Sequence, residues 1–342
     1  MSTTAMQYFH IPDFKFQDGS PPAPVKVAYL DINPTGSKTA LVMSCFRGRL
    51  HSTLNFSSGA LKDHRVIVAA LFGNGESSSP SNMPAGRVPA MFDYQDCVRA
   101  QHRLLTSHLG VVELDVVVGF SMGGQCAYYW TLMYPGTVRS AVIICSSART
   151  SKHNYQFLEG PKAALENSCD YRPYKTDGEV GSTNAVPVVR GLRAFGKAYS
   201  AWLTSAEWFE QEKYTDLGYA TLEEWDREVA GTSYYSWHPD DLLSKVRMWQ
   251  NGDVCKIVRD EISGEQGSLK EALERIKARV LLMPCRTDQY FRWEASQEEA
   301  RYIPRVTFRV IPSIWGHIAG LGASVEDKAW MDSRISEFLS HQ

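Results

Sequence analysis

Apolar and polar positions along the chain alternate between strand-like and helix-like patterns. Continuous runs rich in β-branched and aliphatic residues occupy 25–30, 39–45, 64–71, 115–118 and 140–145. Between them, residues 93–109 and the apolar stretch 126–133 have the length of helices. Strands that alternate with helices predict an α/β fold with a mostly parallel sheet and helices on both faces. Residues 8–16 predict an additional antiparallel edge strand.

The pattern changes between residues 154 and 258. Strand-like runs disappear there, aromatic side chains become frequent, and residues 191–202 and 222–229 show helical spacing. The sheet pattern then resumes, with strands expected at 279–285 and 306–311 and helices at 268–277, 292–302 and 327–339. We therefore predict an α/β core over residues 1–153 and 259–342, interrupted by a helical lid insertion over 154–258. The aromatic residues of this insertion suit either ordinary helix packing or the lining of an acyl pocket.

One motif stands where a predicted strand meets a predicted helix. Val116 to Val118 lead into Gly119-Phe120-Ser121-Met122-Gly123, which has the spelling G-x-S-x-G. In that context the spelling indicates a tight turn that holds the central serine in strained backbone geometry. Such a turn exposes the serine hydroxyl and aims the first N–H groups of the helix at it. Ser121 is therefore the predicted nucleophile, and a chance match in a glycine-containing loop is the alternative.

A serine nucleophile needs a base to take its proton, and histidine has a suitable pKa. The chain order expected with this motif is serine, acid, histidine. Five of the nine histidines precede Ser121. The others are His153 just after a strand, His238 in the insertion, His341 at the terminus, and His317. His317 follows the predicted strand 306–311 and is the expected base, whereas Asp288 follows strand 279–285 and is expected to orient the imidazole.

The remaining site residues are predicted from their place beside this constellation. The strand 39–45 ends at Phe46 and Arg47, so the backbone N–H of Phe46 or Arg47 is expected to converge with that of Met122 as an oxyanion hole. Arg47 is also a candidate for the mouth of the substrate pocket, with a solvated loop as the alternative. No metal-ligand spacing, phosphate-binding loop or dinucleotide motif follows a strand, so neither a metal nor a cofactor is expected.

Composition narrows the possible partners. Apolar residues make up 44% of the 342 residues and charged residues 22%, and the formal net charge is -2. This balance is typical of a globular protein and argues against nucleic-acid or membrane partners. Seven scattered cysteines and an amino terminus without signal-peptide features indicate a cytoplasmic location. A loop rich in Ser, Pro and Gly, residues 74–89, is expected at the surface.

Together these motifs resemble the homoserine O-acetyltransferase branch of the α/β-hydrolase superfamily over nearly the whole chain. The similar segments are residues 117–125, Tyr134-Pro135, residues 147–150, Gly191-Leu192, Leu203-Thr204, residues 233–241, residues 287–291 and Gly316-His317. The resemblance implies an α/β-hydrolase fold. It also implies acyl transfer through Ser121, Asp288 and His317.

Two departures from that family concern the acceptor. The family has an aspartate after the histidine that meets the amino group of homoserine, and this chain has Ile318. After Leu203-Thr204 the family has Tyr-Arg, with the arginine facing the acceptor carboxylate, and this chain has Ser205 and Ala206. Both charges of homoserine would be buried without partners, which is unfavourable. The pattern is more similar to relatives in fungal secondary-metabolite and toxin pathways.

We therefore expect a serine hydrolase that cleaves an ester or thioester of an apolar, polyketide-like acyl group, with a role in secondary metabolism. An acyl-CoA-dependent O-acyltransferase with an acceptor other than homoserine is the first alternative. A non-catalytic ligand receptor on the same fold is the second. A small-molecule substrate is the expected partner, and a homodimer formed through the lid is a further expectation.

Overall fold

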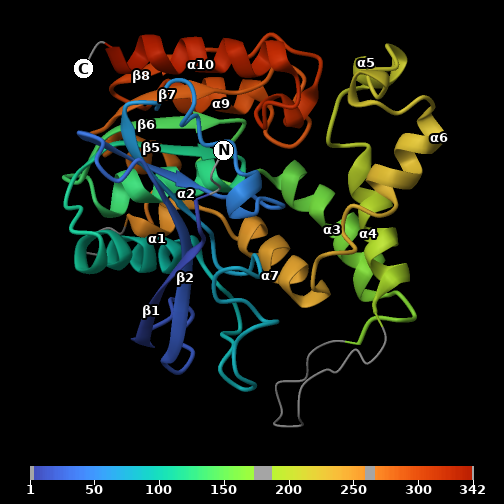
Figure 1. The fold of residues 1–342 in the computed structure, drawn as a ribbon, viewed down its shortest axis with the longest axis horizontal. Helices are drawn as coiled ribbons and strands as arrows, with labels where there is room; N and C mark the ends of the chain where they lie inside the picture. Colours follow the sequence, from blue (N-terminus) through green and yellow to red (C-terminus); the bar gives the residue numbers. More distant parts are fainter. Residues whose placement is uncertain (1–3, 173–186, 259–265, 341–342) are drawn as a thin grey trace.

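The computed structural model describes residues 4–172, 187–258 and 266–340 and has an α/β architecture (Figure 1). Its sheet has the strand order β1-β2-β4-β3-β5-β6-β7-β8. The strands are β1 Gln7–Phe14, β2 Ala23–Ile32, β3 Lys38–Met43, β4 His64–Ala69, β5 Leu114–Phe120, β6 Val138–Ile144, β7 Arg279–Met283 and β8 Val306–Phe308. Strands β1 and β2, and β2 and β4, pair antiparallel, and the other neighbours pair parallel. The predicted mostly parallel sheet and its antiparallel edge strand are both confirmed.

Helices lie on both faces of this sheet. The helices in the described part of the chain are α1 Tyr94–Arg103, α2 Met122–Met133, α3 Lys152–Glu166, α4 Val189–Ser200, α5 Ala206–Glu210, α6 Leu222–Trp225, α7 Pro239–Gln250, α8 Leu269–Glu274, α9 Trp293–Ala300 and α10 Val325–Ser340. Short 3₁₀ turns span Leu50–Ser52, Thr215–Leu217, Val254–Ile257 and Gly316–Ala319, and π turns span Leu104–His108 and Asp226–Ala230. In the described ranges, no helix is long and apolar enough to cross a bilayer.

The central strands are buried on both faces because they separate two hydrophobic cores. Alternate residues such as Leu41 and Val117 pack with side chains of α1 and α2. Their neighbours, such as Val42 and Val118, pack instead with side chains of α10 such as Ile335. Figure 1 shows α1 and α10 on opposite sides of the strands. Burial on both faces explains why these strands appear in the sequence as continuous apolar runs.

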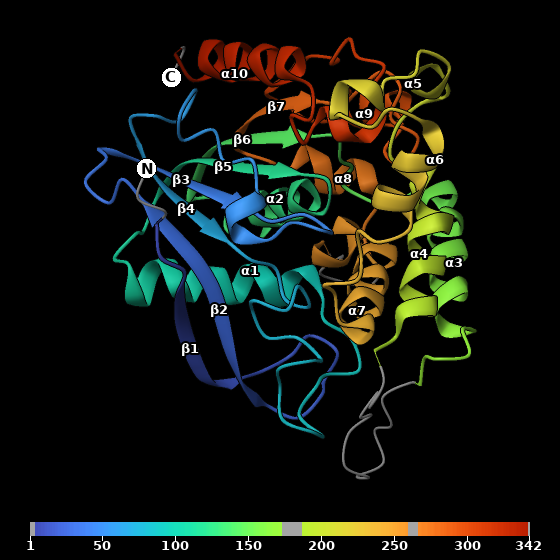
Figure 2. The same ribbon diagram turned by 45° about the vertical axis from the view of Figure 1, so that its right-hand side comes forward.

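The helical segment that follows β6 lies at the carboxyl end of the parallel strands. Figure 2 shows α3, α4 and α6 on the side toward which the arrowheads of β5 and β6 point. Helices α3 and α4 pack on each other, and α7 packs on α3. The helices expected at 191–202 and 222–229 are present as α4 and as α6 with its following π turn. The division of the chain into core and lid segments stays a prediction.

The expectation of a surface loop at residues 74–89 is wrong for its first part. Asn74, Ser77, Ser78 and Ser79 are buried. The Ser77 hydroxyl accepts from the Ala28 N–H at 3.0 Å and donates to the Ala70 carbonyl at 2.9 Å. In the same way, the Ser78 hydroxyl accepts from the Lys26 N–H at 2.9 Å. These serines therefore accept hydrogen bonds from backbone N–H groups of β2 that lie beyond the end of β4. Composition alone does not reveal this role of a Ser-rich loop.

The Ser77→Ala variant tests this account of the loop. It removes one acceptor and one donor from buried backbone groups, so we expect the free energy of unfolding to fall by about 1–3 kcal/mol. Urea denaturation measures the change. The exposed Ser340, whose hydroxyl donates to the Glu337 carbonyl, provides the control variant Ser340→Ala. Equal stability of the two variants would contradict the structural role of Ser77.

Candidate active site

The turn between β5 and α2 places Ser121 in a strained conformation. Ser121 has φ 58° and ψ -124°, a region that residues with a Cβ rarely adopt. The turn is possible because glycines flank it. A Cβ at Gly119 would overlap the Gly123 carbonyl, and a Cβ at Gly123 would lie 2.6 Å from the Met43 carbonyl oxygen. The tight strand-to-helix turn that the sequence indicates is present.

Three predicted residues meet in one hydrogen-bonded chain. The His317 Nε2 atom lies 2.9 Å from Ser121 Oγ, and His317 Nδ1 lies 2.7 Å from Asp288 Oδ2. All three side chains are buried. The other carboxylate oxygen of Asp288 accepts from the backbone N–H groups of Tyr290 at 2.8 Å and Phe291 at 3.1 Å. With Asp288 as acceptor, the proton belongs on Nδ1, which leaves Nε2 free to accept from the serine hydroxyl.

His317 is held in place by its own loop and by aromatic rings. It lies in the 3₁₀ turn Gly316–Ala319 beyond β8, and Gly316 has φ 59°. A Cβ at Gly316 would lie 2.5 Å from the Thr204 carbonyl carbon, so only glycine fits there. The imidazole centroid lies 4.7 Å from that of Phe120 and 4.6 Å from that of Tyr290. The ring is therefore restricted to orientations that can reach Ser121.

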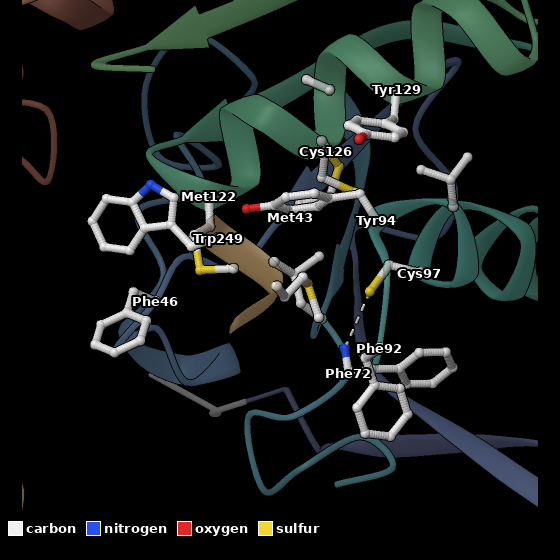
Figure 3. Close-up of a cluster of buried hydrophobic side chains, with 14 of the residues drawn as sticks. Met43, Phe46, Phe72, Phe92, Tyr94, Cys97, Met122, Cys126, Tyr129 and Trp249 are labelled. Carbon is white, nitrogen blue, oxygen red and sulfur yellow. Dashed lines mark hydrogen bonds between the residues drawn. The ribbon is translucent and has the colours of Figure 1, made fainter. Parts of the chain in front are cut away.

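Two backbone segments approach Ser121 from different strands. Met122 is the first residue of α2, where N–H groups have no partner within the helix. The close contact of Gly123 with the Met43 and Ser44 carbonyls brings the loop after β3 to the same place. Figure 3 shows the Phe46 ring of this loop next to Trp249, with Met122 nearby, and the Phe46 and Trp249 centroids are 5.7 Å apart. The oxyanion hole formed by the Met122 and Phe46 N–H groups stays a prediction consistent with this placement.

A cavity of about 310 Å³ opens onto Ser121 and His317. Its other lining residues are Cys45, Phe46, Arg47, Gly48, Ser52, Phe120, Tyr199, Leu203, Thr204, Leu217, Trp225, Val229, Ile318, Leu321 and Ala323. The lining is mainly apolar, and no carboxylate of the described residues belongs to it. Of the aromatic residues in the helical segment, Tyr199 and Trp225 line it, while Trp208 is buried elsewhere. Some aromatic residues of the segment therefore pack in the interior and others line the cavity, and an acyl group in this cavity stays a prediction.

The pocket residues expected from the sequence have different fates. Arg47 and Ile318 line the cavity, and the Arg47 guanidinium carbon lies 5.0 Å from the centre of the Tyr234 ring. Ser205 and Ala206 are not part of the lining. The Ser205 hydroxyl donates to the Ile314 carbonyl and caps α5 by accepting from the Trp208 N–H, while Ala206 is exposed. Their neighbours Leu203 and Thr204 line the cavity instead, which depends on where the chain turns into α5.

The Cys45 thiol and the Tyr199 hydroxyl at the cavity are neutral at pH 7. Burial raises the pKa of the Cys45 thiol and raises the pKa of the Tyr199 hydroxyl well above its ordinary value. Cys45 is therefore not a competing thiolate nucleophile. Within the described part of the chain, no group of three or more His, Cys, Asp or Glu side chains is arranged to hold a metal ion.

Comparisons with known proteins agree with this geometry. Residues 43–166 match the family model for the alpha/beta hydrolase fold. The chain is 33% identical over 278 residues to the ethyl acetate hydrolase of Pseudomonas veronii, covering 80% of this chain and 76% of that protein. It is 25% identical over 264 residues to the homoserine O-acetyltransferase of Cyclobacterium marinum, covering 75% and 71%.

A solved structure extends the likeness to the whole fold. The acetyl esterase MekB superimposes with a TM-score of 0.87 and 28% sequence identity, over 98% of this chain and 97% of that chain. Sequence and fold thus point to the same family, in which esterases and acyltransferases both occur. The chain belongs to the alpha/beta hydrolase family of enzymes.

Proposed function

We propose that this enzyme hydrolyses a small, uncharged ester through an acyl-enzyme on Ser121. Its esterase and acyltransferase relatives support ester hydrolysis or O-acyl transfer in general. The observation that carries the proposal is the hydrogen-bonded chain from Ser121 through His317 to Asp288, which opens onto an apolar cavity. A nucleophile, a base and an orienting carboxylate in this arrangement are the requirements of acyl transfer.

The first half of the reaction forms the acyl-enzyme. Ser121 Oγ attacks the ester carbonyl carbon while His317 Nε2 takes the hydroxyl proton, and Asp288 stabilises the resulting imidazolium. The carbonyl oxygen becomes an oxyanion and accepts hydrogen bonds from the Met122 and Phe46 N–H groups. When this intermediate collapses, the C–O bond to the alcohol breaks, and His317 donates its proton to the departing oxygen.

The second half returns the enzyme to its starting state. His317 takes a proton from a water molecule, whose oxygen attacks the acyl carbonyl and forms a second oxyanion at the same N–H groups. Collapse of this intermediate breaks the bond to Ser121 Oγ. The proton on His317 then returns to the serine, and the carboxylic acid leaves.

The cavity supports a small substrate. A volume of about 310 Å³ lies at the lower end of the range of about 300–1,000 Å³ for ligand pockets. Its apolar lining offers no carboxylate to an ammonium group. The named activities of an ethyl acetate hydrolase and an acetyl esterase among the similar proteins also favour a short acyl group. The polyketide-like acyl group and the role in secondary metabolism stay predictions, and the cavity volume favours the shorter esters.

Transfer of the acyl group to an alcohol other than homoserine is the second candidate function. The likeness to homoserine O-acetyltransferases supports it, because transfer differs from hydrolysis only in the nucleophile that attacks the acyl-enzyme. The absence of a carboxylate from the described lining around Ile318 leaves the ammonium group of homoserine without a partner, which makes homoserine itself a poor acceptor. Adding alcohols to an ester assay and measuring the ratio of transesterified product to free acid separates the two functions.

The Ser121→Ala variant tests the nucleophile. Loss of the nucleophile typically lowers kcat by about 10⁶-fold, and reaction with a fluorophosphonate probe should disappear. Hydrolysis of p-nitrophenyl acetate measures the first effect and mass spectrometry of the labelled protein the second. The control variant Ser77→Ala changes a buried serine outside the site, and it should keep both the ester hydrolysis and the reaction with the probe. A kcat within about tenfold of wild type would exclude Ser121 as the nucleophile.

The Asp288→Asn and His317→Ala variants test the other two roles. His317→Ala removes the base and should lower kcat about as much as Ser121→Ala. Asp288→Asn keeps the geometry but favours the wrong tautomer of the imidazole, so we expect a loss of roughly 10⁴-fold. The same ester assay measures both. An Asp288→Asn variant with wild-type kcat would show that another group orients His317.

The preference for uncharged substrates predicts that homoserine is not acetylated. The described lining has no carboxylate to meet the ammonium group of homoserine, and burying this charge beside Ile318 should lower the rate by a factor of about 10³ or more relative to a neutral acceptor. The purified enzyme is assayed with acetyl-CoA and L-homoserine, and in parallel with p-nitrophenyl esters of increasing acyl length. Rapid formation of O-acetylhomoserine without ester hydrolysis would contradict both the substrate class and the preference for hydrolysis.

A further inference from the structure

Lys245 of α7 is a buried cation in the interior of the protein. Its side chain is 0% exposed, and Nζ donates a hydrogen bond of 2.8 Å to the Cys45 carbonyl oxygen. Among the described residues, no carboxylate lies within 4.0 Å of this ammonium as an ion-pair partner. A buried charge without a counter-ion destabilises a fold unless other interactions offset it. The position of Lys245 therefore requires an explanation other than stability.

The carbonyl that Lys245 contacts belongs to the peptide group whose N–H is that of Phe46. The Gly48 N–H also donates to this carbonyl, at 3.3 Å. A hydrogen bond to the oxygen of a peptide group polarises the group and strengthens its N–H as a donor. A charged donor has the larger effect. The ammonium thus acts on the N–H that is expected to bind the oxyanion.

Helix α7 also supports the same loop through a second side chain. Trp249 follows Lys245 by four residues, so both lie on one face of the helix. Trp249 is buried, and its ring packs on Phe46 with centroids 5.7 Å apart. Figure 3 shows the two rings next to each other. One helix face therefore fixes the Phe46 side chain through Trp249 and the preceding carbonyl through Lys245.

We propose that Lys245 is a positioning residue for the oxyanion hole: its ammonium orients and polarises the Cys45–Phe46 peptide so that the Phe46 N–H stabilises the oxyanion formed at Ser121. This inference rests on the proposed function. Lys245 takes no proton from the substrate and acts only through the peptide group. Burying the charge lowers the stability of the fold, but the polarised peptide group binds the transition state more strongly.

The surroundings of Lys245 predict a dependence on pH. Burial lowers the pKa of Lys245 to about 8, and the groups that face it are the Cys45, Cys97 and Cys126 thiols and the Arg49 guanidinium. The ammonium is present at pH 7 and is lost as the pH rises through about 8. The part of kcat that depends on Lys245 should therefore decline above about pH 8. Because the pKa of Lys245 in the folded protein lies below its ordinary value, the unfolded state holds this proton more tightly. The free energy of unfolding of the wild type should therefore rise as the pH increases above about 8.

The test compares Lys245→Met with Arg247→Met, which removes an exposed positive charge from the same helix. Active sites are first titrated with the fluorophosphonate, so that kcat refers to folded enzyme. For Lys245→Met we expect kcat to fall roughly 10–100-fold, less than the 10²–10³ caused by removing an oxyanion donor outright. KM should stay within about twofold, and the Ki of a trifluoromethyl ketone should rise as much as kcat falls. Tm should be equal to or above that of the wild type.

Other outcomes overturn the proposal. A Lys245→Met kcat within about twofold of Arg247→Met, or a higher KM with unchanged trifluoromethyl ketone affinity, would exclude a role in the oxyanion hole. Lys245→Gln keeps a neutral hydrogen-bond donor, so its kcat should lie between those of the wild type and Lys245→Met. Failure of both variants to fold would assign Lys245 to stability instead.

The outcome for the proposed function is separable. If the wild type hydrolyses no ester but is phosphonylated at Ser121, the proposed function fails. The rate constant of phosphonylation, which also develops negative charge on oxygen at the same N–H groups, then decides the role of Lys245. A slower reaction of Lys245→Met supports it, and equal rates overturn it. A wild type that neither hydrolyses esters nor reacts with the fluorophosphonate would overturn both.

Discussion

The site depends on the close packing of backbone on backbone at the turn around Ser121. Gly119 approaches the Gly123 carbonyl, and Gly123 approaches the carbonyls of Met43 and Ser44, without room for a Cβ at either position. This packing holds Ser121 at φ 58° and at the same time places the end of β3 beside the start of α2. The strain at one residue is maintained because two neighbouring parallel strands and a buried helix surround it.

The parallel sheet then brings the remaining groups to the same edge. Asp288 and His317 follow β7 and β8, which lie beyond β6 from the serine strand, and their loops return toward Ser121. Short loops are sufficient because the carboxyl ends of all these strands face one way. Aromatic rings pack around the imidazole and shield the hydrogen-bonded chain from water. Hydrogen bonds are electrostatically stronger in such an interior than in water.

Helix α7 anchors the helical segment between β6 and β7 to the core through buried side chains. Trp249 and Lys245 are both buried against the loop after β3, and Asp241 accepts from the Ser81 N–H at 2.9 Å and hydroxyl at 2.6 Å. The same segment lines the cavity through Tyr199 and Trp225. The helices after β6 therefore line the cavity and also pack against the loop after β3, so substitutions in this stretch are expected to affect both.

The sequence alone determined the strand and helix pattern of the core, the Ser121 turn, and the candidates Asp288 and His317. These features depend on local chemistry: glycine spacing, apolar periodicity, and the order in which strands end. The lining of the cavity was decided only by tertiary structure. Ser205 caps α5 while its neighbour Thr204 faces the cavity. Ser77 and Ser78 accept hydrogen bonds from N–H groups of β2. Lys245 also escaped prediction, because its partner is a backbone carbonyl 200 residues away, and such a contact leaves no pattern in the sequence.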